Sequence, residues 1–533
     1  MFRGRIGYMA ENKYYQVIDT DVCVIGGSSS GMPAAINAYD KGAKVVILEK
    51  TKRLGGTLGV TCGFFGVESP AQKRLGIHTT AEQAFRELIK VLYWDVDARL
   101  VNFWLSDSGK SVEWLESLGL HFNVVEPFQG LRKYCWRTYH TIDVEEGAGR
   151  PGIEMLKALM KAVEERDIDV HYSTRATHLI KNENGEVVGV EAEDENGTLL
   201  VNAKAVVIAS GSISNNKELI KKFTGRDYAN IQIMARVPHN TGDGLIMADE
   251  IGACTGGISA LFMGPHNHGA GCSELTGMLI RRPMSLKLNK AGERFLDEGL
   301  WTNSNFGWME SYALDHQPDQ VCYTIFGEDQ LKDMVEKNEE IGLFEHLAAT
   351  QECISKKKKE GRLKKDLVDE KFAFYDDADF EGYWMQGLWE EIDKEIAGGR
   401  CKKCETAEEI AEFIGCRRPE AVASSIERYN LHCKNGYDAD FLKAPEHLEK
   451  VNAPYYVFRA YSGVDTFIGG PRINYELKVV DPDWNPIPGL YGAGVGTSGW
   501  LHGGYAFYGT ELSFSFFSGR NAGKNAADYA LNK

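Results

Sequence analysis

The sequence predicts an α/β protein that contains a dinucleotide-binding unit, and three observations in one short segment support this. Residues 22–25 are an apolar run of strand type that stops at Gly26, where the chain must turn. A helix is expected over 32–39, because Pro33 suits the first turn of a helix. Residues 44–48 are a second apolar run, typical of a buried parallel strand. Strand, turn, helix and strand in this order predict a βαβ unit.

The turn of this unit carries an incomplete glycine pattern. Gly26 and Gly31 fit the first and third positions of Gly-x-Gly-x-x-Gly, which permit the sharp turn and the close packing of helix on strand. Ser28 occupies the middle position, where a side chain narrows the approach of backbone to a pyrophosphate. Glu49 stands about 20 residues past the turn, where an acid binds the ribose hydroxyls of an adenine dinucleotide. The alternative is a βαβ unit without a ligand.

Further glycines and helices follow the βαβ unit. Gly55, Gly56 and Thr57 come soon after the acid and supply flexible backbone N–H groups beside the expected pyrophosphate. Apolar residues at helical spacing predict helices within 80–122 and over 152–165. The glycine segment thus extends the expected nucleotide site, and the helix over 152–165 leads into a strand at 169–172.

A β-meander that ends at residue 209 is predicted next. The turn signals Asn184-Gly185 and Asn196-Gly197 separate three β-rich runs, of which the last is 205–209. That last run ends in Ser210 and Gly211, which places them at the end of a strand.

Composition excludes several classes of protein. The 533 residues exceed the size of a single core, so two or more domains are expected. The formal charge of −16 argues against a nucleic-acid or anionic-membrane partner. No apolar run approaches the roughly 20 residues that span a bilayer, and the first residues lack the apolar core of a signal peptide. Eleven scattered cysteines fit reduced thiols, and a cytoplasmic location is expected.

The chain resembles the fumarate reductase and 3-ketosteroid dehydrogenase superfamily of FAD flavoproteins. Five features carry the resemblance and occur in the same order over nearly the whole chain. They are the first βαβ unit, the meander leading into AVVIASGSISNN, the segment NTGDGLIMADEIGA, the segment LNKAGERFLDE and the segment PIPGLYGAG.

The resemblance implies a Rossmann-like FAD-binding domain of glutathione-reductase type with an inserted α+β cap domain. The FAD-binding domain would be discontinuous, formed by 15–254 and 461–533, and residues 255–460 would form the substrate-capping domain. Substrate would then bind between the cap and the flavin.

The resemblance also assigns residues to FAD. Asp243, in NTGDG, would contact the cofactor; a cap of the following helix is the alternative, and both roles could hold together. The family often has a glutamate where this chain has Val495, and Glu511 is the candidate to compensate. The motifs and the resemblance together give these cofactor-binding residues: Gly26, Ser28, Gly31, Glu49, Lys50, Gly55, Gly56, Thr57, Ala176, Ser210, Gly211, Asp243, Gly494, Thr510, Glu511 and Leu512.

The last helix is expected to begin after Gly509. In this family its N-terminal N–H groups would point at the pyrimidine edge of the flavin, where the partial positive charge of a helix N-terminus favours the negative charge of reduction. No histidine stands near Thr57, where members that tether FAD place one. The cofactor is therefore predicted to be non-covalent FAD.

Two arginines of fumarate reductases are missing. The proton-donating arginine of that family belongs where this chain has Leu331, and its carboxylate-clamping arginine belongs where this chain has Ala506. Both losses affect the binding and protonation of a dicarboxylate, because in fumarate reductases one arginine holds it and the other protonates it. The chain is therefore predicted not to be a fumarate reductase.

Ketosteroid dehydrogenases suggest another site. In them a tyrosine and a glycine N–H four residues later polarise a ketone, and Tyr505 and Gly509 have that spacing. His502 could move a proton, and Tyr508 is a further catalytic candidate. Packing against the flavin is the alternative for Tyr505, and a structural hydrogen bond is the alternative for His502. The second tyrosine of that family is replaced by Thr302.

The predicted function is an FAD-dependent oxidoreductase that transfers hydride between flavin N5 and a carbon–carbon bond next to a carbonyl, as an ene-reductase or dehydrogenase. Oxidation of a hydroxyl carbon in a sugar or hydroxy acid is one alternative. A non-catalytic electron-transfer flavoprotein subunit is the other. The expected partners are a small-molecule substrate and an unknown electron donor or acceptor, with no nucleic acid and no membrane span.

Other chemically suggestive residues have structural explanations. Cys401 and Cys404 could form a redox pair or metal site, but their segment is similar to a helical stretch of the family, and no metal is predicted. His266 and His268 are expected to be polar groups of a loop. His140 belongs to a polar and aromatic patch that could line a substrate entrance.

Overall fold

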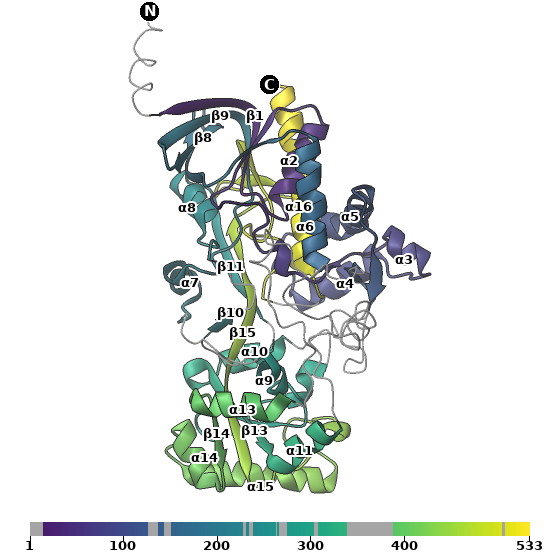
Figure 1. The fold of residues 1–533 in the computed structure, drawn as a ribbon, viewed down its shortest axis with the longest axis vertical. Coiled ribbons are helices and arrows are strands. Elements are labelled where there is room, and N and C mark those ends of the chain that lie inside the picture. The colour runs from purple at the N-terminus through teal and green to yellow at the C-terminus, as the bar shows by residue number, and fades with distance from the viewer. Residues whose placement is uncertain are drawn as a thin grey trace, which may run out of the picture.

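Within the described residues, the computed structural model shows three β-sheets, of eight, six and three strands, with helices packed around them (Figure 1). The first sheet lies at the top of Figure 1 beside the C-terminus, and the second extends from the middle to the bottom. The structure describes residues 14–125, 137–142, 151–227, 231–233, 238–262, 264–265, 274–302, 308–337, 387–503 and 507–533.

The first sheet contains the predicted βαβ unit. Its main path runs β16-β17-β9-β1-β2-β6, and β1 pairs in parallel with both β2 and β9. Parallel pairing buries both faces, which explains why β1 ends in an apolar run and why β2 is entirely buried. The strands of this path are β1 (Gln16–Ile25), β2 (Val45–Leu48), β6 (Asp169–His171), β9 (Gly197–Ile208), β16 (Lys478–Val480) and β17 (Pro486–Gly492).

Two of three neighbouring helices, α2 (Gly31–Asp40) and α16 (Thr510–Leu531), pack against this sheet, and α6 (Pro151–Glu165) packs on α2. The three helices lie side by side in Figure 1. A Cβ on Gly519 would lie 2.3 Å from the carbonyl oxygen of Ser30, and one on Gly523 would lie 2.1 Å from that of Ala34. These glycines let α16 approach α2 closely, so the C-terminal helix closes over the first βαβ unit.

The remaining predicted elements of this region are present. Strands β7 (Arg175–Lys181) and β8 (Val187–Asp194) complete the meander with β9, and its turns use Gly185 at φ +80° and Gly197 at φ +125°. The segment 80–122 contains α4 (Ala81–Val91) and α5 (Ala98–Ser117). Shorter elements are β3 (Phe64–Phe65), α3 (Pro70–Arg74), β4 (Asn123–Val125), β5 (Tyr139–Thr141), α7 (Lys217–Thr224) and α8 (Asp243–Glu250).

The second sheet is built around β15 (Tyr455–Pro471). Its main path is β10-β15-β13-β12, and β11 and β14 also pair with β15. These strands are β10 (Ile231–Ile233), β11 (Thr255–Phe262), β12 (Leu286–Leu288), β13 (Val321–Gly327) and β14 (Cys401–Cys404). The helices around it are α9 (Glu274–Leu279), α10 (Met309–Asp315), α11 (Glu328–Glu336), α13 (Leu388–Ala397), α14 (Ala407–Ile414) and α15 (Pro419–Asn435). Strand β15 runs through residue 460, the expected end of the inserted segment.

The cysteine pair does not lie on a helix, which corrects the prediction from the resemblance. Cys401 and Cys404 are the first and last residues of strand β14, and helix begins only at Ala407. Residues three apart in a strand point to opposite faces. Cys401 packs in one apolar cluster and Cys404 in another, and both are free thiols. Their strand geometry rules out a redox pair between them.

His140 is a core residue and does not line an entrance. Its side chain is fully buried in β5, where Nε2 lies 2.6 Å from Ser69 Oγ and Nδ1 lies 3.0 Å from the carbonyl oxygen of Thr138. Its ring stacks on Phe64 with centroids 5.9 Å apart. Burial lowers the pKa of His140 to about 4, so the ring is neutral near pH 7.

Because His140 is buried in its neutral form, the free energy of unfolding is expected to fall in mild acid. Between pH 6.5 and 4 the unfolded chain binds a proton at His140 and the folded chain does not, so stability falls as pH falls through this window and levels off below it. The expected cost is about 3 kcal/mol, and His140→Gln should flatten the dependence. Urea unfolding at a series of pH values measures it. An NMR titration of His140 near pH 6.5 would contradict the assignment.

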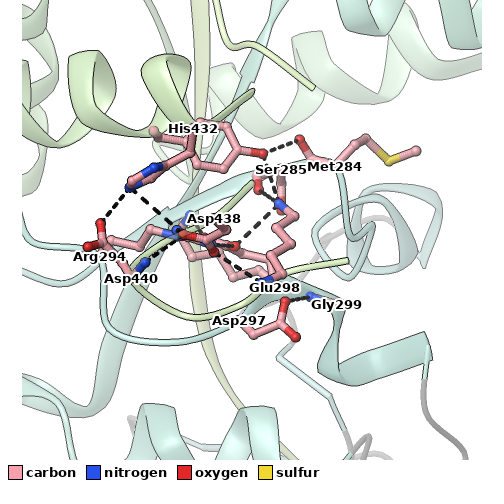
Figure 2. Close-up of polar contacts among 12 residues, drawn as sticks. Met284, Ser285, Arg294, Asp297, Glu298, Gly299, His432, Asp438 and Asp440 are labelled. Atoms are coloured by element: carbon pink, nitrogen blue, oxygen red, sulfur yellow. Dashed lines mark hydrogen bonds and ion pairs between the residues drawn. The ribbon is translucent and has the colours of Figure 1, made fainter. Parts of the chain in front are cut away.

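A network of buried charges joins α15 to the loop after β12 (Figure 2). Arg294 donates to both oxygens of Asp438 at 2.9 and 2.8 Å and to both oxygens of Glu298 at 2.9 and 2.7 Å. Lys443 Nζ lies 3.3 Å from Glu298, and Lys287 is paired with Glu310 in the same interior. The RFLDE segment, which contains Arg294 and Glu298, therefore binds this part of the fold together.

Candidate functional site

A cavity of about 270 Å³ is lined by the glycine turn, the end of β2, the N-terminus of α16 and the middle of β15. Two groups of side chains can be distinguished on its wall by their mutual contacts. The first surrounds Lys50 and Asp243. The second contains Cys62, Tyr139, Asp465, Tyr508 and Glu511 and is called the acid–phenol cluster below.

The glycine turn has the tight geometry that the sequence predicted. Gly26 has φ +97°, and a Cβ there would lie 2.7 Å from the carbonyl oxygen of Ala209. A Cβ on Gly31 would lie 1.7 Å from the carbonyl oxygen of Gly26, so any side chain would push α2 away from β1. Ser28 is tolerated because its hydroxyl donates to the carbonyl oxygen of Gly55 at 2.9 Å. The turn leaves room for a ligand that contacts the backbone.

Glu49 holds two parts of the cavity wall together. Its Oε2 accepts from the backbone N–H of Gly27 at 2.9 Å and its Oε1 accepts from that of Thr51 at 2.8 Å, and the side chain is buried. The carboxylate thus fixes the glycine turn to the end of β2, in addition to the ribose contact expected from its position.

Replacing Glu49 is expected to weaken FAD binding by about 10- to 100-fold, because each charge-assisted bond to a backbone N–H contributes about 1.5–3 kcal/mol. Glu49→Gln keeps the shape but turns one acceptor into a donor, and Glu49→Ala removes both acceptors. FAD per chain after dialysis and the Kd of reconstitution measure the effect. The exposed Glu183→Gln is the matched control. Unchanged FAD occupancy in Glu49→Ala would remove Glu49 from the site.

Asp243 is held by two cations. Its carboxylate accepts from Lys50 Nζ at 2.8 Å, from Arg175 at 2.9 Å and from Thr241 Oγ1 at 3.1 Å. Burial alone would raise the pKa of Asp243, but the hydrogen bonds from Arg175 and Lys50 outweigh it and lower the pKa. The N-cap of α8 is Gly242 and Asp243 is the first helical residue, so the capping alternative is wrong.

The acid–phenol cluster is the other notable part of the wall. Burial raises the pKa of Tyr139 well above its usual value, and the neighbouring acids Cys62, Glu511, Asp465 and Tyr508 raise it further. Burial also raises the pKa of Asp465, against a hydrogen bond with Glu511 that lowers it. The Tyr139 hydroxyl therefore remains a hydrogen-bond donor, and Asp465 and Glu511 form a carboxyl pair.

Helix α16 begins at this cluster. Gly509 is its N-cap with φ +73°, and a Cβ there would lie 2.5 Å from the Cα of Phe64. The carbonyl oxygen of Gly509 accepts from the N–H of Phe65 at 3.0 Å. Gly509, Glu511 and Leu512 line the cavity, so the partial positive charge of the helix N-terminus acts on its interior.

Most residues predicted for the cofactor line this one cavity. Gly31, Gly55, Gly494 and Thr510 do not line it and pack behind its wall, as the contacts of Gly55 N–H with Gly27 and of Gly494 N–H with Ser518 illustrate. The lining members are Gly26, Ser28, Glu49, Lys50, Gly56, Thr57, Ala176, Ser210, Gly211, Asp243, Glu511 and Leu512.

The structure places some of the predicted catalytic residues at the cavity and others away from it. Tyr508 and Gly509 line the cavity. His502 is exposed, does not line the cavity, and has its Nδ1 3.9 Å from Asp95. Tyr505 lies outside the described residues, as do His266 and His268. Sequence reasoning missed the cavity residues Tyr139 and Asp465, because neither lies in a motif.

A possible metal-binding group lies outside this cavity. His432, Asp438 and Asp440 place ligand atoms within 4.8 Å of one another. Arg294 binds Asp438, and Arg428 and His432 bind Asp440 at 2.6 and 2.9 Å. These ion pairs already neutralise the carboxylates, so the group is explained without a metal. Among the described helices, none has the length and apolar character to cross a membrane.

Comparison with known proteins identifies the family. The FAD-binding domain family matches residues 21–512. Vinyl phenol reductase of Lactiplantibacillus plantarum is 28% identical over 535 residues, which cover 96% of each chain. The open form of a flavocytochrome c3 fumarate reductase has a TM-score of 0.67 at 25% identity and covers 99% of this chain and 81% of its own. A 3-ketosteroid Δ1-dehydrogenase of Sterolibacterium denitrificans has a TM-score of 0.72 at 18% identity over 97% of this chain and 100% of its own, which shows a common fold.

The mixed α/β fold, its parallel sheet and the glycine-lined cavity thus define an FAD flavoprotein. This chain belongs to the FAD-binding domain family, within the fumarate reductase and 3-ketosteroid dehydrogenase superfamily. It is an FAD-dependent oxidoreductase of the class that acts on carbon–carbon bonds.

Proposed function

We propose that the chain is an ene-reductase or dehydrogenase for a carbon–carbon bond next to a carbonyl, and not a fumarate reductase. The observation that carries the proposal is a single cavity that combines a dinucleotide-type glycine turn with phenols and a helix N-terminus. The full-length likeness to a vinyl phenol reductase supports the same reaction class.

The residues of the cavity fit FAD. Positions Gly26 and Gly56 have positive φ, and Cβ atoms there would collide with Ala209 and Ser28, so the wall depends on bare backbone. Glu49 and the group around Lys50 and Asp243 would hold the ribose and adenine portion. FAD, when bound, supplies hydride exchange at flavin N5.

The chain's own groups would donate hydrogen bonds to the substrate oxygen and stabilise the negative charge that develops during the reaction. The Tyr139 hydroxyl stays protonated and can donate to a carbonyl oxygen, and Tyr508 lines the same wall. Tyr505 and Gly509 keep the spacing proposed for holding such an oxygen, with His502 or a tyrosine moving the proton. The N-terminus of α16 favours negative charge that develops in the cavity.

The case against fumarate rests on the position of the missing arginine. Leu331 is fully buried on α11, in an apolar cluster with Phe326 and Met334. A cation at that position would have to replace a core side chain. We propose, in addition, that residues 255–460 cap a glutathione-reductase-type FAD domain formed by 15–254 and 461–533, and that an electron donor or acceptor still to be identified completes the cycle.

Anaerobic reoxidation tests the function. Holoenzyme reduced by light should be reoxidised by 4-(4-hydroxyphenyl)but-3-en-2-one, an alkene next to a carbonyl, and not by fumarate. Reoxidation by fumarate alone would contradict the proposal. Reduction of the oxidised enzyme by a hydroxy acid or sugar alone would favour oxidation of a hydroxyl carbon. If only a partner protein exchanges electrons with the flavin, the chain is an electron-transfer subunit.

FAD is expected to be released by acid. With no histidine near Thr57 to tether it, the cofactor is held only by the contacts of the cavity. After precipitation with trichloroacetic acid, the yellow colour should stay in the supernatant, and the absorbance of both fractions measures this. Flavin retained in the washed pellet would show a covalent bond.

A further inference from the structure

The wall of the cavity carries an uneven distribution of charge. Lys50, Arg53, Arg175 and His239 lie with Glu49 and Asp243, and two of these cations bind Asp243 directly. The titratable members of the acid–phenol cluster, by contrast, are two carboxylic acids, two phenols and one thiol. The two parts of the wall would therefore favour different ligand groups.

The centre of the acid–phenol cluster is the carboxyl pair. Asp465 is on β15, the long strand of the second sheet, and Glu511 is in the first turn of α16. Both side chains line the cavity and a hydrogen bond joins them. Two carboxyl groups that share a hydrogen bond need at least one proton between them, and the pair carries one negative charge when it holds a single proton.

A phenol of the same cluster is also fixed. Tyr139 is buried, and its ring packs against Gly63, where a Cβ would lie 2.8 Å from the ring. Strand β5 holds it through its pairing with Phe65 on β3. The cluster thus offers one rigid phenol donor and a carboxylate acceptor, with no guanidinium or ammonium group among its described members.

We propose that Asp465 and Glu511 determine the charge class of the substrate, so that the site accepts an uncharged alkene bearing a hydroxyl or phenol group and rejects alkenes that carry a carboxylate. This inference rests on the proposed function. A carboxylate would meet the negative charge of the pair, whereas a hydroxyl group can donate to the carboxylate and a carbonyl can accept from Tyr139. At about 6 Å and an effective dielectric constant of about 20, the repulsion corresponds to roughly a 100-fold difference in affinity.

Two probes of similar shape test this on the FAD-loaded enzyme. 4-(4-Hydroxyphenyl)but-3-en-2-one is uncharged, and 4-hydroxycinnamate carries a carboxylate in place of the acetyl group. Binding to the oxidised enzyme is followed by the change in flavin absorbance, and turnover by reoxidation of the reduced enzyme. The ketone is expected to bind about 100-fold more tightly at pH 7.5.

Variants assign the preference to the pair. Asp465→Asn and Glu511→Gln keep the shapes and remove an acid, so each should reduce the ketone-to-carboxylate ratio at least about 10-fold. Asp465→Glu should keep the ratio. Glu250→Gln, at an exposed residue outside the cavity, controls for the change in net charge. FAD per chain is measured for every variant. If Asp465→Asn and Glu511→Gln lose FAD, the inference is tested by the ketone-to-carboxylate ratio of the wild type and of Asp465→Glu.

The outcomes separate this inference from the function on which it rests. Equal binding of the two probes by the wild type, binding of neither probe, or an unchanged ratio in FAD-loaded Asp465→Asn and Glu511→Gln overturns the inference, whatever the turnover. If the enzyme binds the ketone selectively but no alkene reoxidises the reduced flavin, the inference on charge selection stands and the proposed reductase function is contradicted.

Discussion

Replacing Gly31 by alanine is expected to prevent stable FAD binding and to lower the free energy of unfolding by about 3 kcal/mol or more. The new Cβ would lie 1.7 Å from the carbonyl oxygen of Gly26, and ordinary contact requires about twice that distance. Because that atom is backbone, no side chain can rotate away. Helix α2 would have to move from β1, and α16 packs on α2 at Ser30 and Ala34, so the displacement would spread to the cavity wall.

FAD per chain and the midpoint of thermal unfolding measure this effect. Gly387→Ala is the matched control, since Gly387 has φ −87° and a Cβ there would meet nothing within 4 Å. The control should keep its flavin and its midpoint. A Gly31→Ala protein that is yellow, with full FAD occupancy and an unchanged midpoint, would show that the turn relaxes at little cost.

The nucleotide-binding half of the fold was predictable because its signals are local. Gly26 must adopt a positive φ, the runs at β1 and β2 are buried on both faces, and Glu49 follows β2 directly. Backbone geometry and apolar pattern therefore point to one element order. Ser28 replaces the middle glycine of the pattern without harm because its hydroxyl donates to a carbonyl oxygen 27 residues away. The local sequence does not reveal this contact.

The substrate half was less predictable because its residues meet only in three dimensions. Asp465 and Tyr139 reach the cavity from β15 and β5, which share no motif. Cys401 and Cys404 were predicted on a helix from resemblance, although strand pairing with β15 determines their conformation. His140 looked polar in sequence, but the fold supplies Ser69 as a partner and buries it. Long-range contacts decided each of these cases.

Replacing Asp438 by asparagine is expected to cost about 3–5 kcal/mol, because it removes one partner of a fully buried ion pair (Figure 2). Burial by itself would raise the pKa of Asp438, but Arg294 outweighs it and holds the pKa at about 2, so the carboxylate is charged throughout the neutral range. Its oxygens also accept from the backbone N–H groups of Asp440 and Lys443 at 3.1 and 3.2 Å. Asparagine cannot accept with both atoms, and Arg294 would keep a buried charge balanced by Glu298 alone.

The loss should appear as a fall of roughly 10 °C in the midpoint of thermal unfolding, measured by circular dichroism on the FAD-loaded protein. FAD per chain should be retained in the folded variant, because the network lies outside the cavity wall. Asp319→Asn removes one partner of the exposed pair with Lys290 and should change stability by less than about 1 kcal/mol. Equal midpoints for Asp438→Asn and Asp319→Asn would mean that burial of the Arg294 network adds nothing to stability. A larger loss at Asp438 locates that stability between α15 and the loop after β12, far in sequence from the nucleotide site.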